Sequence, residues 1–253
     1  MGSEGQFWFV HEDQLGRIYV GGDGLLIFDG QSWKMQSMAG AKALRTIQFG
    51  PDGRLWVGAL NELGFFTEPT VGHFEYHSLL PSLPEAERQV EHIWGSGLVG
   101  PNVYFMGREK LYRWDGTTFR IWNFPGQSRL FPLHLGQETW FQHRETGLYR
   151  ITESGPELVL DHTQLPDTGI LGLSRDADGL LLVSSLGLFR PGQPAHRVFS
   201  DEINQYIIDN RLTCYAKMAD GTHLVGTING GIEVISAGGQ LLRLLDLRDH
   251  PML

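Results

Sequence analysis

Histidines and carboxylates are the side chains of this sequence that could hold a metal ion or transfer a proton. The chain has 253 residues and 10 histidines, and His73 and His77 lie four apart in a segment with strand-like alternation. On a strand this spacing keeps both rings on one face but roughly 13 Å apart, too far for one ion. We therefore expect no metal and no cofactor.

Two acidic pairs, Glu85 with Glu87 and Asp201 with Glu202, could act as the carboxylates of a hydrolase or lyase. Because each pair lies in a polar segment, we interpret them as solvated surface. The sequence contains no Gly-x-Ser-x-Gly, Walker-type loop, His-Glu-x-x-His or paired Cys-x-x-Cys motif. The residues thus predict no catalytic centre, and we expect a protein that is not an enzyme.

The single cysteine, Cys214, cannot form an internal disulfide. It lies in the alternating stretch Leu212 to Ala216, which is typical of a strand, and free cysteines are usually buried. We expect it to be a small buried apolar residue. One cysteine is compatible with either a reducing or an oxidising compartment.

The formal net charge of -9 argues against a nucleic-acid partner, because affinity for phosphates comes mainly from Lys and Arg. No apolar run approaches the roughly 18 residues of a membrane helix, so we expect no membrane contact by this chain. Residues 1–3, Met-Gly-Ser, resemble a cloning remnant, and the missing signal peptide is therefore uninformative about secretion.

Internal repeats provide the main information on the fold. A short apolar or aromatic strand after a turn recurs along the whole chain. Its copies are Gly16 to Gly21, Gly53 to Gly58, Val103 to Gly107, Thr139 to Phe141, Leu181 to Val183 and His223 to Gly226. Their spacing averages about 41 residues, which is close to the length of a propeller blade.

Further strands surround each copy. A Gly-Leu-aromatic strand follows most of them, and the dipeptides Asp29-Gly30 and Asp115-Gly116 then predict tight hairpin turns. These turns lead into outer strands at Trp33 to Met35 and Phe119 to Trp122. With one strand upstream, such as Leu44 to Phe49, each repeat has four strands. No segment has sustained helical periodicity, and only Leu83 to His92 could form one or two helical turns.

The sequence therefore predicts an all-β fold, a β-propeller of six four-stranded antiparallel blades in a single domain over residues 4–253, or part of a seven-bladed ring. The approximate blades are 6–38, 42–80, 89–124, 128–162, 169–200 and 210–248. We expect blade-to-blade packing from the aromatic residues Trp56, Tyr104, Trp140, Phe66, Tyr149 and Phe189. Asp52, Asp178 and Asp220 lie at predicted turns, where Asp bonds to its own backbone.

The repeats share Asp-x-x-Gly, then Arg-Leu-Trp-Val-Gly, then a turn and Gly-Leu-aromatic. The pattern is clearest at Asp13 to Asp29, Gly50 to Phe66, Gly179 to Arg190 and Asp220 to Glu233. It resembles the two-component regulator propeller repeat, which forms the extracytoplasmic sensor of bacterial hybrid histidine kinases and related diguanylate cyclases. The third and fourth repeats depart from it, with Pro101-Asn102 and Gly136-Gln137 at the turn.

In that family the propeller is followed by an immunoglobulin-like domain, a membrane helix and a kinase or cyclase. None of these follows here, and the outer-strand pattern of Leu241 to Leu247 lies just before the last residue, Leu253. The resemblance implies a fragment of a larger receptor, periplasmic or extracytoplasmic in its parent protein. It implies a sensor that works by recognition.

Ligand-binding residues are expected on loops, which carry function on rigid scaffolds. In a propeller, the loops that lead into the innermost strands and those between second and third strands surround the central channel. Reading these loops from the repeats selects Arg45, Asn61, Glu62, His92, Arg108, Arg129, His143, Arg144, Arg211 and Asn229. Arginines and histidines converging on one face would suit a small-molecule or oligosaccharide ligand with carboxylate or sulfate groups; ordinary solvated loop residues are the alternative.

Two other functions remain open at this stage. Propeller lyases and glycoside hydrolases exist, and streptogramin-type lyases have similar blades, so a fold alone does not exclude catalysis. An interaction scaffold would show an exposed apolar patch. If the six blades do not close, unpaired edges of the first and last blades would favour self-association.

Overall fold

The computed structural model describes residues 6–38 and 42–246. The remnant expected at residues 1–3 and the predicted end of the last outer strand at Leu247 lie outside these ranges. The chain divides into two compact units. Unit 1 comprises residues 1–132 and 152–155, and unit 2 comprises 133–151 and 156–253.

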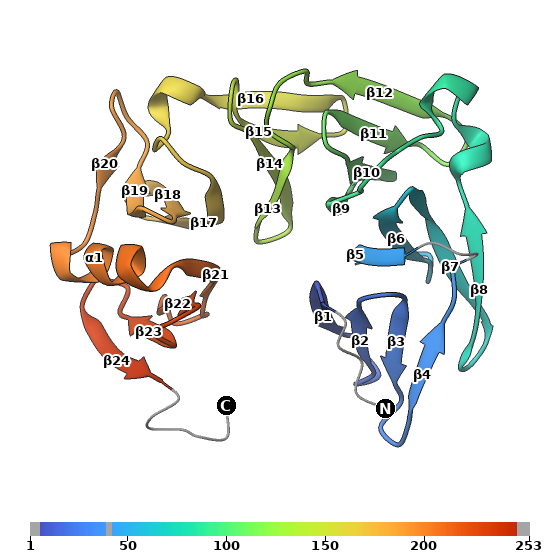
Figure 1. Ribbon diagram of the computed structural model, residues 1–253, viewed down its shortest axis with the longest axis horizontal. Coiled ribbons are helices and arrows are strands. Elements are labelled where there is room, and N and C mark those ends of the chain that lie inside the picture. The colour runs from blue at the N-terminus through green and yellow to red at the C-terminus, as the bar shows by residue number, and fades with distance from the viewer. Residues whose placement is uncertain (1–5, 39–41, 247–253) are drawn as a thin grey trace. The chain divides into compact units, whose positions relative to one another are not determined.

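The blades of unit 1 are three antiparallel sheets of four strands, each ordered as in the sequence (Figure 1). Blade 1 contains β1 (Phe9–Glu12), β2 (Ile18–Gly21), β3 (Leu25–Phe28) and β4 (Trp33–Gln36). Blade 2 contains β5 (Lys42–Phe49), β6 (Leu55–Leu60), β7 (Glu62–Thr70) and β8 (His73–Ser78). Blade 3 contains β9 (Gly95–Val99), β10 (Asn102–Met106), β11 (Lys110–Trp114) and β12 (Phe119–Asn123).

The blades of unit 2 repeat the same order of four strands. Blade 4 contains β13 (Phe131–Leu135), β14 (Glu138–His143), β15 (Gly147–Thr152) and β16 (Gly155–Asp161); a few of its residues group with unit 1. Blade 5 contains β17 (Ile170–Asp176), β18 (Gly179–Ser184), β19 (Gly187–Arg190) and β20 (His196–Arg197). Blade 6 contains β21 (Leu212–Lys217), β22 (His223–Thr227), β23 (Ile232–Ile235) and β24 (Leu241–Leu245).

The fold is a β-propeller of six blades, as the repeats predicted. The two Asp-Gly turns form as expected, because Gly30 and Gly116 have φ angles of 94° and 98°, which only glycine adopts without strain. Their aspartates, Asp29 and Asp115, accept hydrogen bonds from the backbone N–H groups of the same turns. These turns fix the strand register locally.

The hydrophobic core lies between consecutive blades. One cluster joins blades 1 and 2 and a second joins blades 2 and 3, so that β6 is buried on both faces. In unit 2, one cluster joins blades 4 and 5 and another joins blades 5 and 6. The predicted packing role is confirmed for Trp56, Phe66, Trp140 and Phe189, which belong to these clusters. Tyr104 is buried and stacks on Trp122 of its own blade, and Tyr149 is half-buried and stacks on Phe141 at 4.9 Å.

One helix, α1 (Asp201–Asn210), was not predicted from the sequence. The Ser200 hydroxyl caps its N-terminus by accepting a hydrogen bond from the N–H of Ile203, and Ile203 and Ile207 are buried. This is a serine N-cap followed by apolar residues four apart, but the acidic first turn was interpreted only as surface. Between Leu83 and His92, the structure has a single short 3-10 turn at Glu85–Glu87.

The expectation that Cys214 is buried is wrong, because this residue is exposed. It lies on β21, where it pairs with Gly226 of β22. Alternation along a strand predicts which residues share a face, but not whether another sheet covers that face. Among the described residues, no helix is long and apolar enough to cross a membrane.

Candidate functional site

Three large side chains occupy equivalent positions in or next to the first strands of blades 1, 2 and 3; Trp8 and Trp94 directly precede β1 and β9, and Arg45 lies within β5. These residues are Trp8, Arg45 and Trp94. The residues that directly follow them, Phe9, Thr46 and Gly95, pair across the sheet with Gly21, Gly58 and Met106 of the second strands. The N–H groups of Trp8 and Trp94 donate to the carbonyls of Gly21 and Met106, respectively. The repeat geometry therefore brings the three residues to the same end of their blades.

Arg45 lies between the two tryptophans. Its guanidinium carbon is 3.8 Å from the ring centroid of Trp8 and 4.0 Å from that of Trp94. Its Nε donates a hydrogen bond of 3.0 Å to Nδ1 of His92. Its Nη1 is buried and has no hydrogen-bond partner among the residues that the structure describes.

Arg129 precedes β13, and its side chain lies against the indole of Trp94, as that of Arg45 does. Its guanidinium carbon is 3.8 Å from the centroid of Trp94 and 4.4 Å from that of Phe131. The His92 ring is 5.0 Å from Trp94. We call Trp8, Arg45, His92, Trp94 and Arg129 the cationic cluster. All five are partly exposed and belong to unit 1.

Both guanidinium groups of the cluster carry charge without a matching anion. Burial lowers the pKa of Arg45, and burial together with the charge of Arg45 lowers the pKa of Arg129, yet arginine remains protonated at neutral pH. Across residues 6–38 and 42–246, no carboxylate oxygen lies within 4.0 Å of either group. Two close like charges without a counterion favour the binding of an anion.

His92 is held as a neutral acceptor. Burial and the charges of Arg45 and Arg129 lower its pKa, against a smaller opposing effect of Glu91. Because an arginine Nε always carries hydrogen, Nδ1 of His92 must be unprotonated to accept its bond. The proton of the neutral ring therefore lies on Nε2, where it is a further donor.

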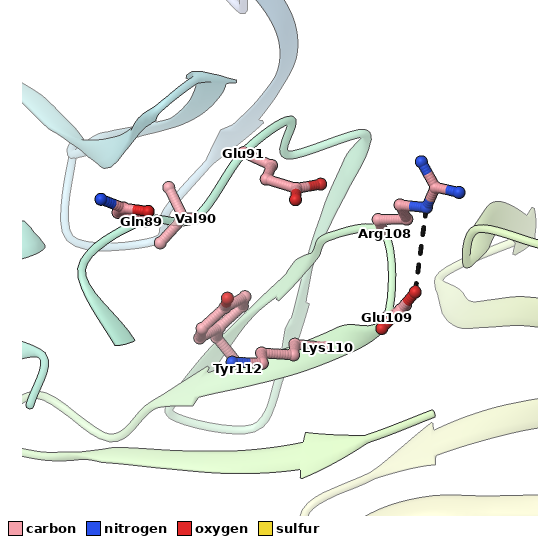
Figure 2. Close-up of a pocket in the computed structure, with 7 residues that line it drawn as sticks. All are labelled: Gln89, Val90, Glu91, Arg108, Glu109, Lys110 and Tyr112. Carbon is pink, nitrogen blue, oxygen red and sulfur yellow. Dashed lines mark ion pairs between the residues drawn. The ribbon is translucent and has the colours of Figure 1, made fainter. Parts of the chain in front are cut away.

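A polar pocket of about 330 Å³ adjoins the cluster (Figure 2). It is lined by Gln89, Val90, Glu91, Arg108, Glu109, Lys110 and Tyr112. Glu91 directly precedes His92, and the Arg108 carbonyl accepts from the N–H of Leu130, the residue after Arg129, so that one lining residue neighbours the cluster in sequence and another bonds to a residue that does. Arg108 pairs loosely with Glu109 at 3.9 Å, which leaves this guanidinium exposed at the rim.

The structure thus brings together Arg45, His92 and Arg129, with Arg108 in the adjoining pocket. Asn61 lies next to the pocket residue Glu91, because its backbone N–H donates to the carbonyl of Glu91. Its φ angle of 54° is left-handed. Glu62 differs, because its side chain is buried and Oε1 accepts from the N–H of Leu63 and the hydroxyl of Ser78. We interpret Glu62 as a structural residue.

The remaining selected residues belong to unit 2. His143 is fully buried, with Nδ1 2.8 Å from the hydroxyl of Thr146, whereas Arg144 is exposed on the turn that follows. Arg211 ends α1 with a left-handed φ of 61°. It lies beside the β22–β23 turn that carries Asn229, because its carbonyl accepts from the N–H of Ile228. These residues do not form a charged cluster like that of unit 1.

Trp8 and Trp94 were missed by the sequence analysis. A prediction based on charged and polar loop residues does not select tryptophans. Counting back from the second-strand residues Gly21, Gly58 and Met106 to their partners in the first strands places Trp8, Arg45 and Trp94 in one column. No group of three or more His, Cys, Asp or Glu residues in the described part of the chain could hold a metal ion.

Comparisons with known proteins support the fold. No family model matches the chain, and no curated protein matches it. Virginiamycin B lyase from Staphylococcus aureus is similar with a TM-score of 0.64 and 15% identity, over 92% of this chain and 82% of that one. The extracellular domain of the putative hybrid two component system BT4673 from B. thetaiotaomicron has a TM-score of 0.54 and 19% identity, over 92% of this chain and 38% of that one. The WD40 β-propeller domain of Doa1 has a TM-score of 0.64 and 9% identity, over 98% and 84%.

These identities are low, and a lyase, a sensor domain and a WD40 domain are all similar to the chain. The likeness therefore establishes a propeller and leaves the function to the residues of the site.

Proposed function

We propose that this chain is a ligand-binding propeller that recognises an anionic small molecule or oligosaccharide at the cationic cluster, and that it acts by binding rather than by catalysis. The observation that carries the proposal is the pair Arg45 and Arg129 on Trp94, both partly exposed and neither paired with a carboxylate among the described residues. The buried Nη1 of Arg45 supplies a donor without a partner.

A carboxylate or sulfate group fits this arrangement. Planar guanidinium groups bind such anions with two parallel hydrogen bonds, and this geometry is more specific than that of lysine. Trp94 holds the guanidinium groups in place through cation–π contacts, each worth about 0.5–2 kcal/mol at partly exposed sites. In the adjoining pocket, Gln89, Glu91 and Glu109 offer acceptors for hydroxyl groups, which suits a sugar that carries an acidic group.

The biological context that we propose is the extracytoplasmic sensor region of a bacterial two-component or related receptor. The repeats resemble those of such sensors, and the extracellular domain of BT4673 shares the fold. The chain spans 38% of that domain. An output domain and the partners of a whole receptor are therefore part of the proposal.

Calorimetric titration tests the binding. Oligosaccharides of uronic acids and sulfated sugars should bind to the wild type, and neutral oligosaccharides of the same length should bind weakly or not at all. The Arg45→Gln and Arg129→Gln variants should each weaken binding by about 10-fold or more, which corresponds to the loss of a charge-assisted hydrogen bond of about 1.5–3 kcal/mol.

Arg54→Gln is the matched control. Arg54 also lies over a ring, that of Phe65 at 4.8 Å, but it is paired with Asp52 and lies at the opposite end of β6. This variant should bind like the wild type. Unchanged affinity in both cluster variants would refute the site, and a ligand shortened or cleaved after incubation, detected by mass spectrometry, would refute a purely binding role.

A further inference from the structure

The two arginines of the cationic cluster lie on opposite faces of one indole. The guanidinium carbon of Arg45 is 4.0 Å from the ring centroid of Trp94, and that of Arg129 is 3.8 Å from it. A carbon at these distances stands over a face of the ring, because contact with the ring edge would keep it farther from the centroid. Two planar guanidinium groups so close to one centroid would overlap if they shared a face. They therefore lie on either side of Trp94.

Further rings hold each guanidinium group from its other side. The guanidinium carbon of Arg45 is 3.8 Å from the centroid of Trp8, and the planes of Trp8 and Trp94 are inclined by 84°, so that Arg45 fills the corner between two indoles. On the opposite face, the guanidinium carbon of Arg129 is 4.4 Å from the centroid of Phe131. Each charge is thus held between two rings of unit 1, and neither guanidinium group can turn around Trp94 to approach the other.

The separation of the two charges follows from the same distances. The guanidinium carbons of Arg45 and Arg129 are at most 7.8 Å apart, which is the sum of their distances from the Trp94 centroid. They are at least about 7 Å apart, because atoms in contact with either face stay about 3.5 Å from the ring. The two charges are therefore held at a nearly fixed spacing.

One anionic group cannot bind both arginines in the preferred geometry. A carboxylate or sulfate that forms two parallel hydrogen bonds lies directly against the edge of a guanidinium group, with N···O distances of about 2.7–2.9 Å. Because Trp94 fills the space between the two guanidinium groups, an anionic group against Arg45 is too far from Arg129 for a second contact of this kind. Neither arginine is paired with a carboxylate among the described residues. Matching both charges therefore requires two anionic groups.

We infer that the ligand of the cationic cluster carries two anionic groups, one bound by Arg45 and the other by Arg129, at the spacing that Trp94 imposes on the two guanidinium groups. The inference rests on the proposed function and narrows its ligand class to oligosaccharides with acidic groups on two neighbouring sugars. Trp94 is then a specificity-determining residue, because it separates the two anionic groups and disfavours ligands that carry only one.

Calorimetric titration with uronic acid disaccharides tests the number of anionic groups. Digalacturonate, diguluronate and dimannuronate each carry two carboxylates but differ in how these are oriented. In each disaccharide, either carboxylate can be blocked as a methyl ester, which removes its charge and keeps the sugar. The diacid that binds most tightly to the wild type should lose about 10-fold or more in affinity in both of its mono-esters, because each ester removes one charge-assisted contact.

Arginine variants test which arginine binds which carboxylate. Arg45→Gln should weaken the binding of the diacid and of one mono-ester by about 10-fold or more, and it should leave the affinity for the other mono-ester unchanged. Arg129→Gln should give the reverse assignment. Arg54→Gln is the matched control, because Arg54 is paired with Asp52, and it should bind every ligand like the wild type. Circular dichroism checks that each variant is folded.

The outcomes separate this inference from the proposed function. Equal affinity of the wild type for a diacid and its mono-esters would overturn the inference and leave the proposed function standing, as would equal losses for one mono-ester in both arginine variants. The same holds if longer uronic acid oligosaccharides bind and all three disaccharides do not, because the acidic groups would then not lie on neighbouring sugars. Binding by no uronic acid or sulfated oligosaccharide of any length would refute the proposed function itself.

Discussion

Glu233 is a buried carboxylate whose ionisation should control the stability of blade 6. Glu233 is 1% exposed, and its Oε2 has no hydrogen-bond partner within the described part of the chain. Its cross-strand neighbours are Val225 and Leu244. Burial, and to a smaller extent the charge of Glu202 on α1, raises the pKa of Glu233 from 4.5 to about 7.

The direction of the pH dependence follows from this pKa. Below about 4.5, Glu233 is protonated in the folded and the unfolded chain, and its ionisation costs nothing. Between 4.5 and 7, only the unfolded chain releases the proton, so the free energy of unfolding falls as pH rises. At about 1.4 kcal/mol per pH unit, a change from 4.5 to about 7 corresponds to about 3 kcal/mol lost by pH 8.

Glu233→Gln removes this ionisation and keeps the shape of the side chain. At pH 8 the variant should be more stable than the wild type by up to about 3 kcal/mol, which is roughly 6–12 °C in melting temperature for a chain of this size. At pH 4.5 the two proteins should melt within a few degrees of each other. Melting followed by circular dichroism at both pH values measures the effect.

Glu85→Gln serves as the control, because Glu85 is an exposed carboxylate on a 3-10 turn of unit 1. It should keep the pH profile of the wild type. If Glu233→Gln is no more stable than the wild type at pH 8, or if its pH profile is unchanged, the reasoning about a buried ionisable group in blade 6 is refuted.

Three further predictions concern packing and the cluster. Asn204→Ala should lower the free energy of unfolding by about 2–3 kcal/mol in urea titration, because its side-chain amide bonds the N–H of Leu188 and the carbonyls of Val198 and Ser200, and only Ser200 keeps a second bond, from the backbone N–H of residue 204; Gln205→Ala on the exposed side of α1 should cost little, and equal effects would contradict this role. Gly58→Ala should cost about 1–3 kcal/mol in the same assay, because a Cβ would lie 2.3 Å from a side-chain carbon of the next blade, whereas Gly169→Ala meets no atom within 4 Å and should be nearly neutral. By NMR titration, the pKa of His92 should lie below its ordinary value; a normal or raised value would argue against the neutral acceptor.

The sequence alone determined the repeat, and with it the fold. Glycines at turns, such as Gly30 and Gly116, and alternating apolar strands act over a few residues, so their pattern predicts strands and hairpins directly. Six copies then require sheets that cover each other. The helix α1 was overlooked because its serine cap and two buried isoleucines make a short and weak pattern.

The site was predicted in part. Arg45, His92 and Arg129 were selected because loop positions can be counted from the repeats, but no local pattern showed that their side chains share one indole, that of Trp94. The two arginines on this indole, at positions 45 and 129, are 84 residues apart in sequence. Only the packing of consecutive blades brings them together.

Coverage of the blade faces was likewise decided by the tertiary structure. The alternation in β21 correctly places Cys214 on one face of a strand, but a face is buried only where another sheet lies against it. In the first strand of blade 5, β17, Ile170 and Leu173 are buried, whereas Cys214 in the first strand of blade 6, β21, is exposed. Local residue order determines strands and turns, whereas burial and convergence of charges depend on contacts between segments that are distant along the chain.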